Sequence, residues 1–336
     1  MARRALGPAG LQIVQAVRAV LPADDRPVVV ACSGGADSMA VARAVAQLAR
    51  SGGSRPPVAS AVVIDHGLQA GSAEVALRVA ERLQAIGVEV RIRRVQVAAD
   101  SADGLEAAAR RARYAALCEL AGPESLVLLG HTLDDQAETV LLGLARGSGT
   151  RSLAGMPAAF GAGPRFLRPL LGVRRTTTAQ ACREWGLDIW SDPQNDDPSF
   201  ARVRVRRNVL PMLEAELGPG IAEALARTAA IARQDADALD EIAAPLLPAV
   251  GEGLAVSVLR GTPEAISARV LRGWLIAGGV DQPSYAHLRA VQALVNDWHG
   301  QAGIDLPGGF RVTRVEGVLR LGRTPHIVGG AGARIC

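Results

Sequence analysis

A short serine- and glycine-rich segment, SGGADS at residues 33–38, has the residue types and spacing that point most directly to chemistry. Its glycines allow a tight turn and a close approach of the backbone to an anion, and its hydroxyl groups can donate hydrogen bonds. A strand pattern precedes the segment and a helical pattern follows it, so free amide groups at a helix N-terminus would point at the same anion. We predict a phosphate-binding loop made of Ser33, Gly34, Gly35, Ala36, Asp37 and Ser38; a plain turn with helix caps is the alternative.

Asp37 is the acidic residue of this segment. Its carboxylate would be repelled by phosphate groups unless a cation lay between them. We therefore expect Asp37 to hold Mg²⁺ against the phosphates. The alternative role is compensation of the dipole at the N-terminus of the following helix.

The composition narrows the classes of protein. All 37 basic residues are arginine, which excludes a Walker-type phosphate loop, a Schiff base and a pyridoxal site, so an amine nucleophile would have to arrive as substrate. The net charge of +4 is compatible with nucleic-acid binding. The four cysteines form no Cys-x-x-Cys pair, which argues against zinc or a redox dithiol. With no run of about 18 apolar residues and no signal peptide pattern, we expect no membrane contact and a cytoplasmic location.

A second polar group follows another apolar run, residues 125–131. Asp134 and Glu138 are four residues apart and Asp135 and Glu138 are three apart, which places these carboxylates on one helix face. Carboxylates held close together repel, so a cation is expected among them. His131 stands beside the helix start and could assist the removal of a proton. The alternative is ordinary helix N-terminal chemistry, with Thr132 as the cap and acids in the first turn.

Two weaker candidate groups lie on other elements. Glu106, Arg110 and Arg113 share one face of a predicted helix. They would either form ion pairs on the surface or place the guanidinium group of Arg110 or Arg113 against the phosphates or the cytidine. Asp65 and His66 end a predicted strand, where they would contact the adenosine of a nucleotide or only make a turn.

An arginine-rich stretch, RVRVRR at residues 202–207, precedes the helix-rich part of the chain. If the stretch is extended, alternate side chains lie on one side. We predict contacts to the phosphates of RNA, which would supply affinity but not sequence choice; a charged, solvated edge strand is the alternative. The residues are Arg202, Arg204, Arg206 and Arg207.

The elements that must position these residues alternate between strand and helix. Apolar runs at residues 28–33, 58–65, 88–97 and 125–131 read as strands, and residues 72–86, 106–120 and 132–146 read as helices. This order predicts a doubly wound parallel α/β sheet, in which ligands bind at the carboxyl ends of the strands.

The polar stretch from residue 192 marks a change in composition. We expect an ATP-binding catalytic domain over residues 1–207 and a smaller, helix-rich α+β domain over residues 208–322. Within the latter, the runs LAVSVL, FRVTRV and GVLRLG look strand-like. A flexible tail is expected over residues 323–336.

Several motifs carry a resemblance to a known family. VACSGGADS resembles the PP-loop of N-type ATP pyrophosphatases, which cleave ATP between its α and β phosphates. Further segments are similar to tRNA(Ile)-lysidine synthetases, although Gln194 stands where that family usually has a serine. These segments are VVIDHGLQ (62–69), LEAAARRARYAAL (105–117), GHTLDDQAETVLLGLARGSG (130–149), DPQNDDPSFARVRVR (192–206) and DLPGGFRVTRVEGVLRL (305–321).

The resemblance implies a ligase that uses ATP and Mg²⁺. The wobble cytidine (position 34) of a tRNA(Ile) with a CAU anticodon would be adenylated at its C2 oxygen, and the amine of free L-lysine would then displace AMP to give lysidine. It implies that Asp135 and Glu138 recognise lysine, with His131, Arg110, Arg113 and Arg206 at the catalytic centre. No obligatory protein partner is expected. The alternatives are a PP-loop enzyme that thiolates a base, one that makes an amide on a small molecule, and a non-enzymatic module that binds nucleotide or RNA.

Overall fold

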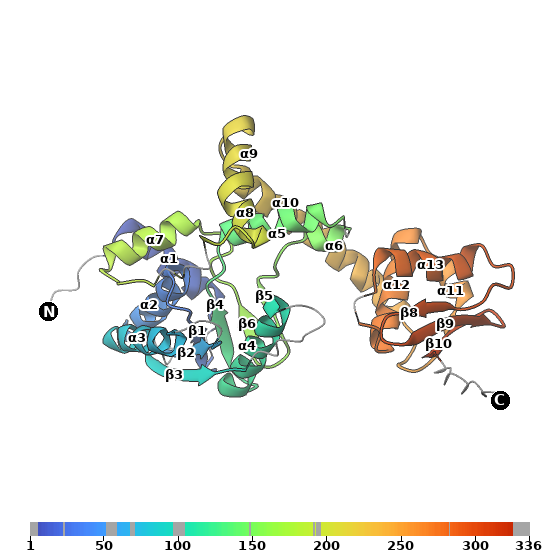
Figure 1. Cartoon of the computed structure of the whole chain (residues 1–336), viewed down its shortest axis with the longest axis horizontal. Coiled ribbons are helices and arrows are strands. Elements are labelled where there is room, and N and C mark those ends of the chain that lie inside the picture. The colour runs from blue at the N-terminus through green and yellow to red at the C-terminus, as the bar shows by residue number, and fades with distance from the viewer. Residues whose placement is uncertain are drawn as a thin grey trace, which may run out of the picture. The chain divides into compact units, whose positions relative to one another are not determined.

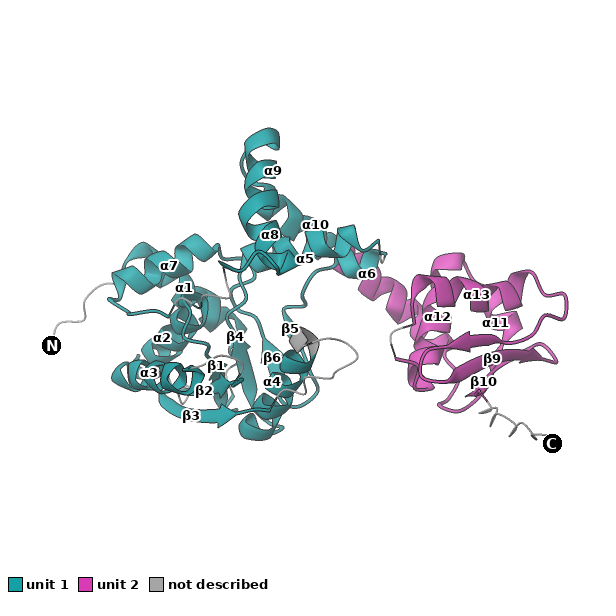
Figure 2. Cartoon of the chain, in the orientation of Figure 1, with its two compact units in different colours: residues 1–231 teal, residues 232–336 magenta. Residues whose placement is uncertain are grey.

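The computed structural model describes residues 6–22, 24–51, 59–67, 71–96, 105–147, 149–190, 192, 196–281 and 283–324. The side chains of residues 105–107 are also outside the description, so the predictions for the Glu106 side chain, for Gln194 and for a tail beyond residue 324 fall outside it. The chain divides into two compact units, residues 1–231 and 232–336 (Figure 2). This division falls within a long helix, α10 (Ile221–Ala243), and the predicted domain end at residue 207 stays a prediction.

The first unit is built on a six-stranded sheet of order β3-β2-β1-β4-β6-β5. Its strands run parallel except β5, which pairs antiparallel to β6. This confirms the predicted α/β fold class, although β5 and β6 were not predicted. The strands are β1 (Val28–Ala31), β2 (Ala59–Asp65), β3 (Glu89–Arg94), β4 (Leu126–Leu129), β5 (Ala159–Phe160) and β6 (Arg165–Leu167).

Helices cover both faces of this sheet (Figure 1). Val28 and Val30 of β1 belong to the core that includes residues of α1, α2, α3 and α7. Val29, which points to the other face, packs with Leu117 of α4. Because strands buried on both faces need no polar side, they appear in the sequence as continuous apolar runs. The helices are α1 (Pro8–Val20), α2 (Ala36–Arg50), α3 (Ser72–Ala85), α4 (Leu105–Ala121), α5 (Leu133–Ala145), α6 (Thr150–Leu153) and α7 (Arg175–Glu184).

The arginine-rich stretch is helical, so the row of alternate side chains considered for an extended stretch does not form, and the edge-strand alternative is wrong. Residues Ala201–Arg204 form α8, and Val205–Val209 form a π-helical segment that leads into α9 (Leu210–Leu217). Val205 packs against a small core that includes Leu133 and Ala137 of α5. Tertiary packing of Val205 against α5 therefore overrides the strand-like alternation of valine and arginine.

The second unit pairs a four-stranded antiparallel sheet of order β7-β10-β9-β8 with helices, which confirms the predicted α+β character. Its core contains Leu271 and Leu275 of α12, Leu294 of α13 and Leu319 of β10. The run LAVSVL is a strand only at Leu254–Ala255 and then turns into α11. The elements are a short 3-10 helix (Ala244–Leu246), β7 (Leu254–Ala255), α11 (Val256–Arg260), α12 (Glu264–Ala277), α13 (Tyr285–Asn296), β8 (Ile304–Leu306), β9 (Phe310–Val315) and β10 (Val318–Arg323).

Among the described helices, none combines the length and apolar character needed to cross a membrane.

Candidate active site

The predicted phosphate loop lies between β1 and the first turn of α2. Gly34 has a φ of 86°, and a Cβ there would lie 2.4 Å from a methyl group of Val79, so only glycine fits this turn. The Ser38 hydroxyl accepts a hydrogen bond from the amide of Ser33 at 3.2 Å and donates to the carbonyl of Gly35 at 3.0 Å. These bonds hold the loop in a bent shape at the N-terminus of a 15-residue helix.

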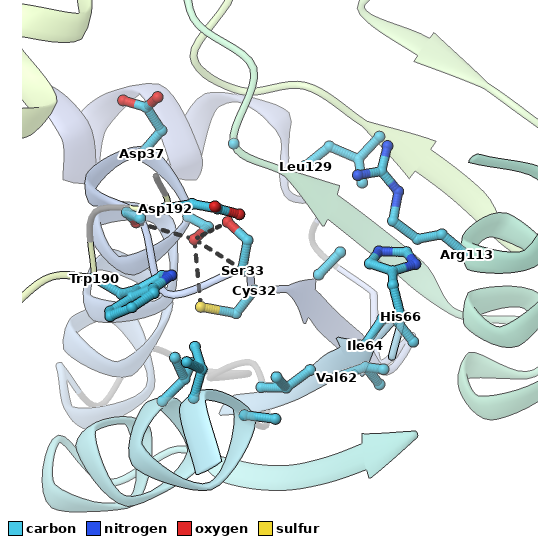
Figure 3. A pocket seen from close by; sticks show the side chains of 18 of the residues that line it. Cys32, Ser33, Asp37, Val62, Ile64, His66, Arg113, Leu129, Trp190 and Asp192 are labelled. Atoms are coloured by element: carbon cyan, nitrogen blue, oxygen red, sulfur yellow. Dashed lines mark hydrogen bonds between the residues drawn. The ribbon is translucent and has the colours of Figure 1, made fainter. Parts of the chain in front are cut away.

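The loop borders a cavity of about 580 Å³ at the carboxyl ends of β1, β2 and β4. Figure 3 shows Ser33 after β1, His66 after β2 and Arg113 from α4 around this space. The structure thus gathers at one place side chains that are far apart in the sequence, as expected for a doubly wound sheet. The predicted site residues that line the cavity are Ser33, Gly35, Ala36, Asp37, Ser38, Asp65, His66, Arg113, His131, Asp135 and Arg206.

Asp37 lies in the first turn of α2, and two residues of α7 contact its carboxylate. Its carboxylate accepts a hydrogen bond from the Thr178 hydroxyl and lies 3.7 Å from Nε of Arg175. Burial, with a smaller effect of nearby Asp135, raises the pKa of Asp37 to about 6 against these two partners. The described part of the chain contains no group of three or more histidine, cysteine or acidic side chains that could hold a metal ion. A metal at this site would therefore be bound by Asp37 and by oxygen atoms of a bound nucleotide, and oxygen ligands suit Mg²⁺.

Asp135 takes part both in a helix cap and in the cavity wall. Its Oδ2 accepts from the Thr132 amide at 2.8 Å in a capping box, so the ordinary cap chemistry is present. Its Oδ1 accepts from Arg175 Nη2 at 2.7 Å, and the residue lines the cavity. Burial alone would raise the pKa of Asp135, but Arg175 and Thr132 together hold it below its usual value. The carboxylate is therefore charged and positioned.

Glu138 is fully buried and lies behind the cavity wall. Arg206 contacts it with both arms of its fork, Nε to Oε1 at 2.7 Å and Nη2 to Oε2 at 3.1 Å. Arg175 adds two contacts to Oε1, from Nη1 at 3.1 Å and from Nη2 at 3.2 Å. Asp135 and Glu138 thus form an acidic pair bridged by two guanidinium groups, which offset part of the cost of burying the carboxylate.

Arg175 is a central site residue that the sequence patterns did not predict. It lines the cavity and reaches from Asp37 to both members of the acidic pair. Its backbone amide donates to the carboxylate of Asp134 at 2.7 Å. Arg174 and Arg175 begin α7 at its positive end, where basic residues are unfavourable. That mismatch is the signal in the sequence that could have identified them.

His131 has a defined ring orientation. Its Nδ1 accepts a hydrogen bond from Nε of Arg168 at 3.1 Å. Burial, followed by the positive charge of Arg168, lowers the pKa of His131 to about 4 against the opposing effect of Asp135. The imidazole is therefore neutral at physiological pH, with its Nδ1 lone pair already used.

The remaining predicted residues divide between the cavity and its edge. Arg113 lines the cavity, whereas Arg110 is exposed beside the Tyr114 ring. Asp65 accepts from the Gly67 amide at 2.9 Å, so it does form the strand-end turn that was the simpler alternative. The Nδ1 of His66 is buried and has no hydrogen-bond partner among the described residues. His66 is therefore the member of this group with unused hydrogen-bonding capacity at the cavity.

The four arginines of the basic stretch do not act as one row. Arg206 holds Glu138, and Arg202 lies 3.7 Å from the same carboxylate. Arg204 donates to the carbonyls of residues 198 and 199, at 2.8 and 2.7 Å. Arg207 pairs with Asp196 on the surface. Helical geometry therefore sends two of them to the acidic pair and leaves two near solvent.

The arrangement of strand, glycine loop, helix and cavity defines a PP-loop protein. A family model described as a PP-loop domain matches residues 11–213, and one described as a TilS substrate binding domain matches residues 254–320. A tRNA(Ile)-lysidine synthase of Rhodococcus erythropolis is 49% identical over 94% of this chain and 95% of its own length. A tRNA(Ile)-lysidine synthase of Thermobifida fusca is 50% identical over 87% of this chain and 90% of its own length.

The chain belongs to the tRNA(Ile)-lysidine synthase family. Among solved structures, a U34-tRNA thiolase from Methanococcus maripaludis with a [4Fe-4S] cluster shares the fold, with a TM-score of 0.52 and 16% identity over 66% of this chain and 78% of its own. The relatives do not favour the predicted alternatives of base thiolation or small-molecule amide ligation.

Proposed function

We propose that the protein ligates free L-lysine to C2 of the wobble cytidine of a tRNA(Ile) with a CAU anticodon, at the expense of ATP. One observation carries the proposal: in a chain of this family, a bent phosphate loop and Asp135 of the acidic pair border the same cavity, with Glu138 directly behind its wall. A site that must join a nucleotide, a base and an ammonium group needs both features within reach of one another.

The first step is adenylation of the cytidine. The C2 oxygen attacks the α-phosphate, a P–O bond forms, and the bond to pyrophosphate breaks. We assign the phosphates to the amides and hydroxyls of Ser33–Ser38, because a helix N-terminus favours anions. We assign the α-phosphate to Arg113, whose guanidinium lines the cavity and whose pKa burial lowers. A buried cation of this kind is stabilised by an incoming anion.

The second step is transfer of lysine. The ammonium binds to Asp135 and Glu138 and gives up a proton to one of these carboxylates. Its nitrogen then forms a bond to C2, and the C2–O bond breaks so that the oxygen leaves with AMP. Arg175 and Arg206 already contact these carboxylates. Both arginines also line the cavity, so phosphate oxygens can compete for their guanidinium groups and free the carboxylates for lysine.

Mg²⁺ fits this site through Asp37, and when bound it would neutralise charge on the phosphates. We place the reaction in the cytoplasm, where ATP and tRNA meet. The second unit and the exposed Arg204 and Arg207 are our candidates for contacts with the RNA, through its phosphates.

The test incubates the full chain with ATP, Mg²⁺, radiolabelled lysine and an unmodified CAU transcript of tRNA(Ile). We expect label in the RNA, with one AMP and one pyrophosphate released for each lysine incorporated. A transcript with uridine in place of the wobble cytidine is the matched control and should stay unlabelled. Folded protein that hydrolyses ATP without labelling the CAU transcript would contradict the proposal.

A further inference from the structure

We propose that His131 acts as a neutral hydrogen-bond donor through Nε2, and that Arg168 is the positioning residue that fixes this tautomer. The inference rests on the proposed function for the identity of the acceptor. It differs from the sequence-based prediction, in which His131 helps to remove a proton.

The first observation is the direction of the hydrogen bond. A guanidinium group is only a donor, so the contact from Arg168 Nε to His131 Nδ1 at 3.1 Å requires an acceptor at Nδ1. A neutral imidazole with a lone pair on Nδ1 carries its proton on Nε2. The tautomer therefore follows from the chemistry of the partner.

Arg168 is held so that it cannot easily turn away. Its side chain is buried, with only 4% of the residue's surface exposed. Its Nη1 donates to the carbonyl of Pro157 at 2.6 Å, and its guanidinium lies 4.4 Å from the centre of the Phe160 ring. A guanidinium group fixed in this way presents its Nε–H to His131 in one orientation.

The charged groups around His131 favour a ring without charge. Arg168, Arg113 and Arg110 all oppose a proton on the imidazole, whereas Asp135 favours one. Burial acts in the same direction as the three arginines and is the largest effect, so the pKa of His131 falls to about 4. A base with so low a pKa removes protons poorly at neutral pH.

His131 lines the cavity together with Asp135 and residues of the phosphate loop. Because Arg168 occupies Nδ1, Nε2 is the ring nitrogen that can serve a ligand there. In the proposed second step the C2–O bond breaks and its electron pair stays on an oxygen of AMP. A fixed N–H donor at that oxygen stabilises the developing charge without transferring a proton. We assign this contact to Nε2–H of His131.

The direct test is nitrogen NMR of the full chain labelled with ¹⁵N-histidine, with His131 assigned from the signal lost in His131→Gln. We expect Nε2 to be protonated and Nδ1 to be bare, with no titration between about pH 5 and 8. Arg168→Leu should raise the pKa of His131, so that the ring begins to titrate within about pH 5 to 8. Arg165→Leu, which removes an exposed guanidinium from β6, is the matched control and should leave the ring unchanged.

Activity gives a second readout if Arg168→Leu does not fold. A glutamine side chain would keep an amide N–H close to the position of Nε2 but has no basic nitrogen. His131→Gln should therefore retain lysine transfer within about tenfold of wild type, whereas His131→Ala should lose about a hundredfold. Equal losses in the two variants would overturn the donor role. A wild-type ring protonated on Nδ1, or one that titrates near its usual pKa, would overturn the assignment even if the ligase activity is established.

Discussion

Replacing Glu138 with glutamine should weaken the first unit because it removes the charge that holds two arginines. The carboxylate is fully buried and receives four hydrogen bonds, two from Arg206 and two from Arg175. A hydrogen bond to a charged group contributes about 1.5–3 kcal/mol, and the glutamine carbonyl can still accept from one guanidinium group. Since the arginine side chains are each 27% exposed, water recovers part of the loss. We expect Glu138→Gln to lower the free energy of unfolding by about 3 kcal/mol.

Thermal and urea unfolding measure this effect directly. For a unit of this size each kcal/mol shifts the melting temperature by about 2–4 °C, so a decrease of about 6–12 °C is expected. Glu264→Gln is the matched control, because Glu264 also pairs with an arginine, at 2.9 Å, but its side chain is 72% exposed; it should cost less than about 1 kcal/mol. If the two variants melted within about one degree of each other, the claim that Glu138 anchors the arginines would be refuted.

Other parts of the site give three more predictions. Gly130→Ala should abolish nucleotide binding, because the new Cβ would lie 2.8 Å from the backbone nitrogen of Ser38; isothermal titration with an ATP analogue measures this, with Gly172→Ala, which meets nothing within 4 Å, as the control. His131 has a pKa of about 4 against 6.5 in its usual state, so between those values the unfolded chain binds the proton and the folded chain does not. Lowering the pH from about 7 to about 5 should therefore reduce the free energy of unfolding of the wild type by about 2 kcal/mol more than that of His131→Gln, as measured by urea unfolding. Equal reductions in the two proteins would contradict the low pKa of His131. Arg207→Gln should weaken tRNA binding without changing anticodon preference and should reduce the slope of log affinity against log salt by about one; an unchanged slope would remove Arg207 from the RNA surface.

The central strands and the phosphate loop could be predicted from the sequence, because neighbouring residues determine them. The central strands of the first unit are buried on both faces, so they appear as apolar runs, and the loop at residues 33–38 contains its own glycines and hydrogen-bonding hydroxyls. β5 and β6 have only two and three residues, which is too short for a period to be recognised. Their positions depend on pairing with β4 and with each other.

The site was predictable only in part, because its central contacts join distant segments. The acidic pair followed from helical spacing, but its partner Arg175 lies 40 residues from Asp135 and belongs to another helix. The stretch at residues 202–207 is helical, so the row of arginines considered for an extended stretch does not form. Val205 packs against α5, and this packing, which the alternating pattern does not reveal, selects a helix.

The central claim is that main-chain amides of the bent loop bind the triphosphate in the cavity that Asp135 of the acidic pair also lines. A crystal structure of the full chain with a non-hydrolysable ATP analogue and Mg²⁺ tests it most directly. We predict phosphate oxygens within hydrogen-bond distance of the amides of residues 34–38 and of the hydroxyls of Ser33 or Ser38. A nucleotide bound elsewhere, with this loop making no contact to phosphate, would contradict the claim.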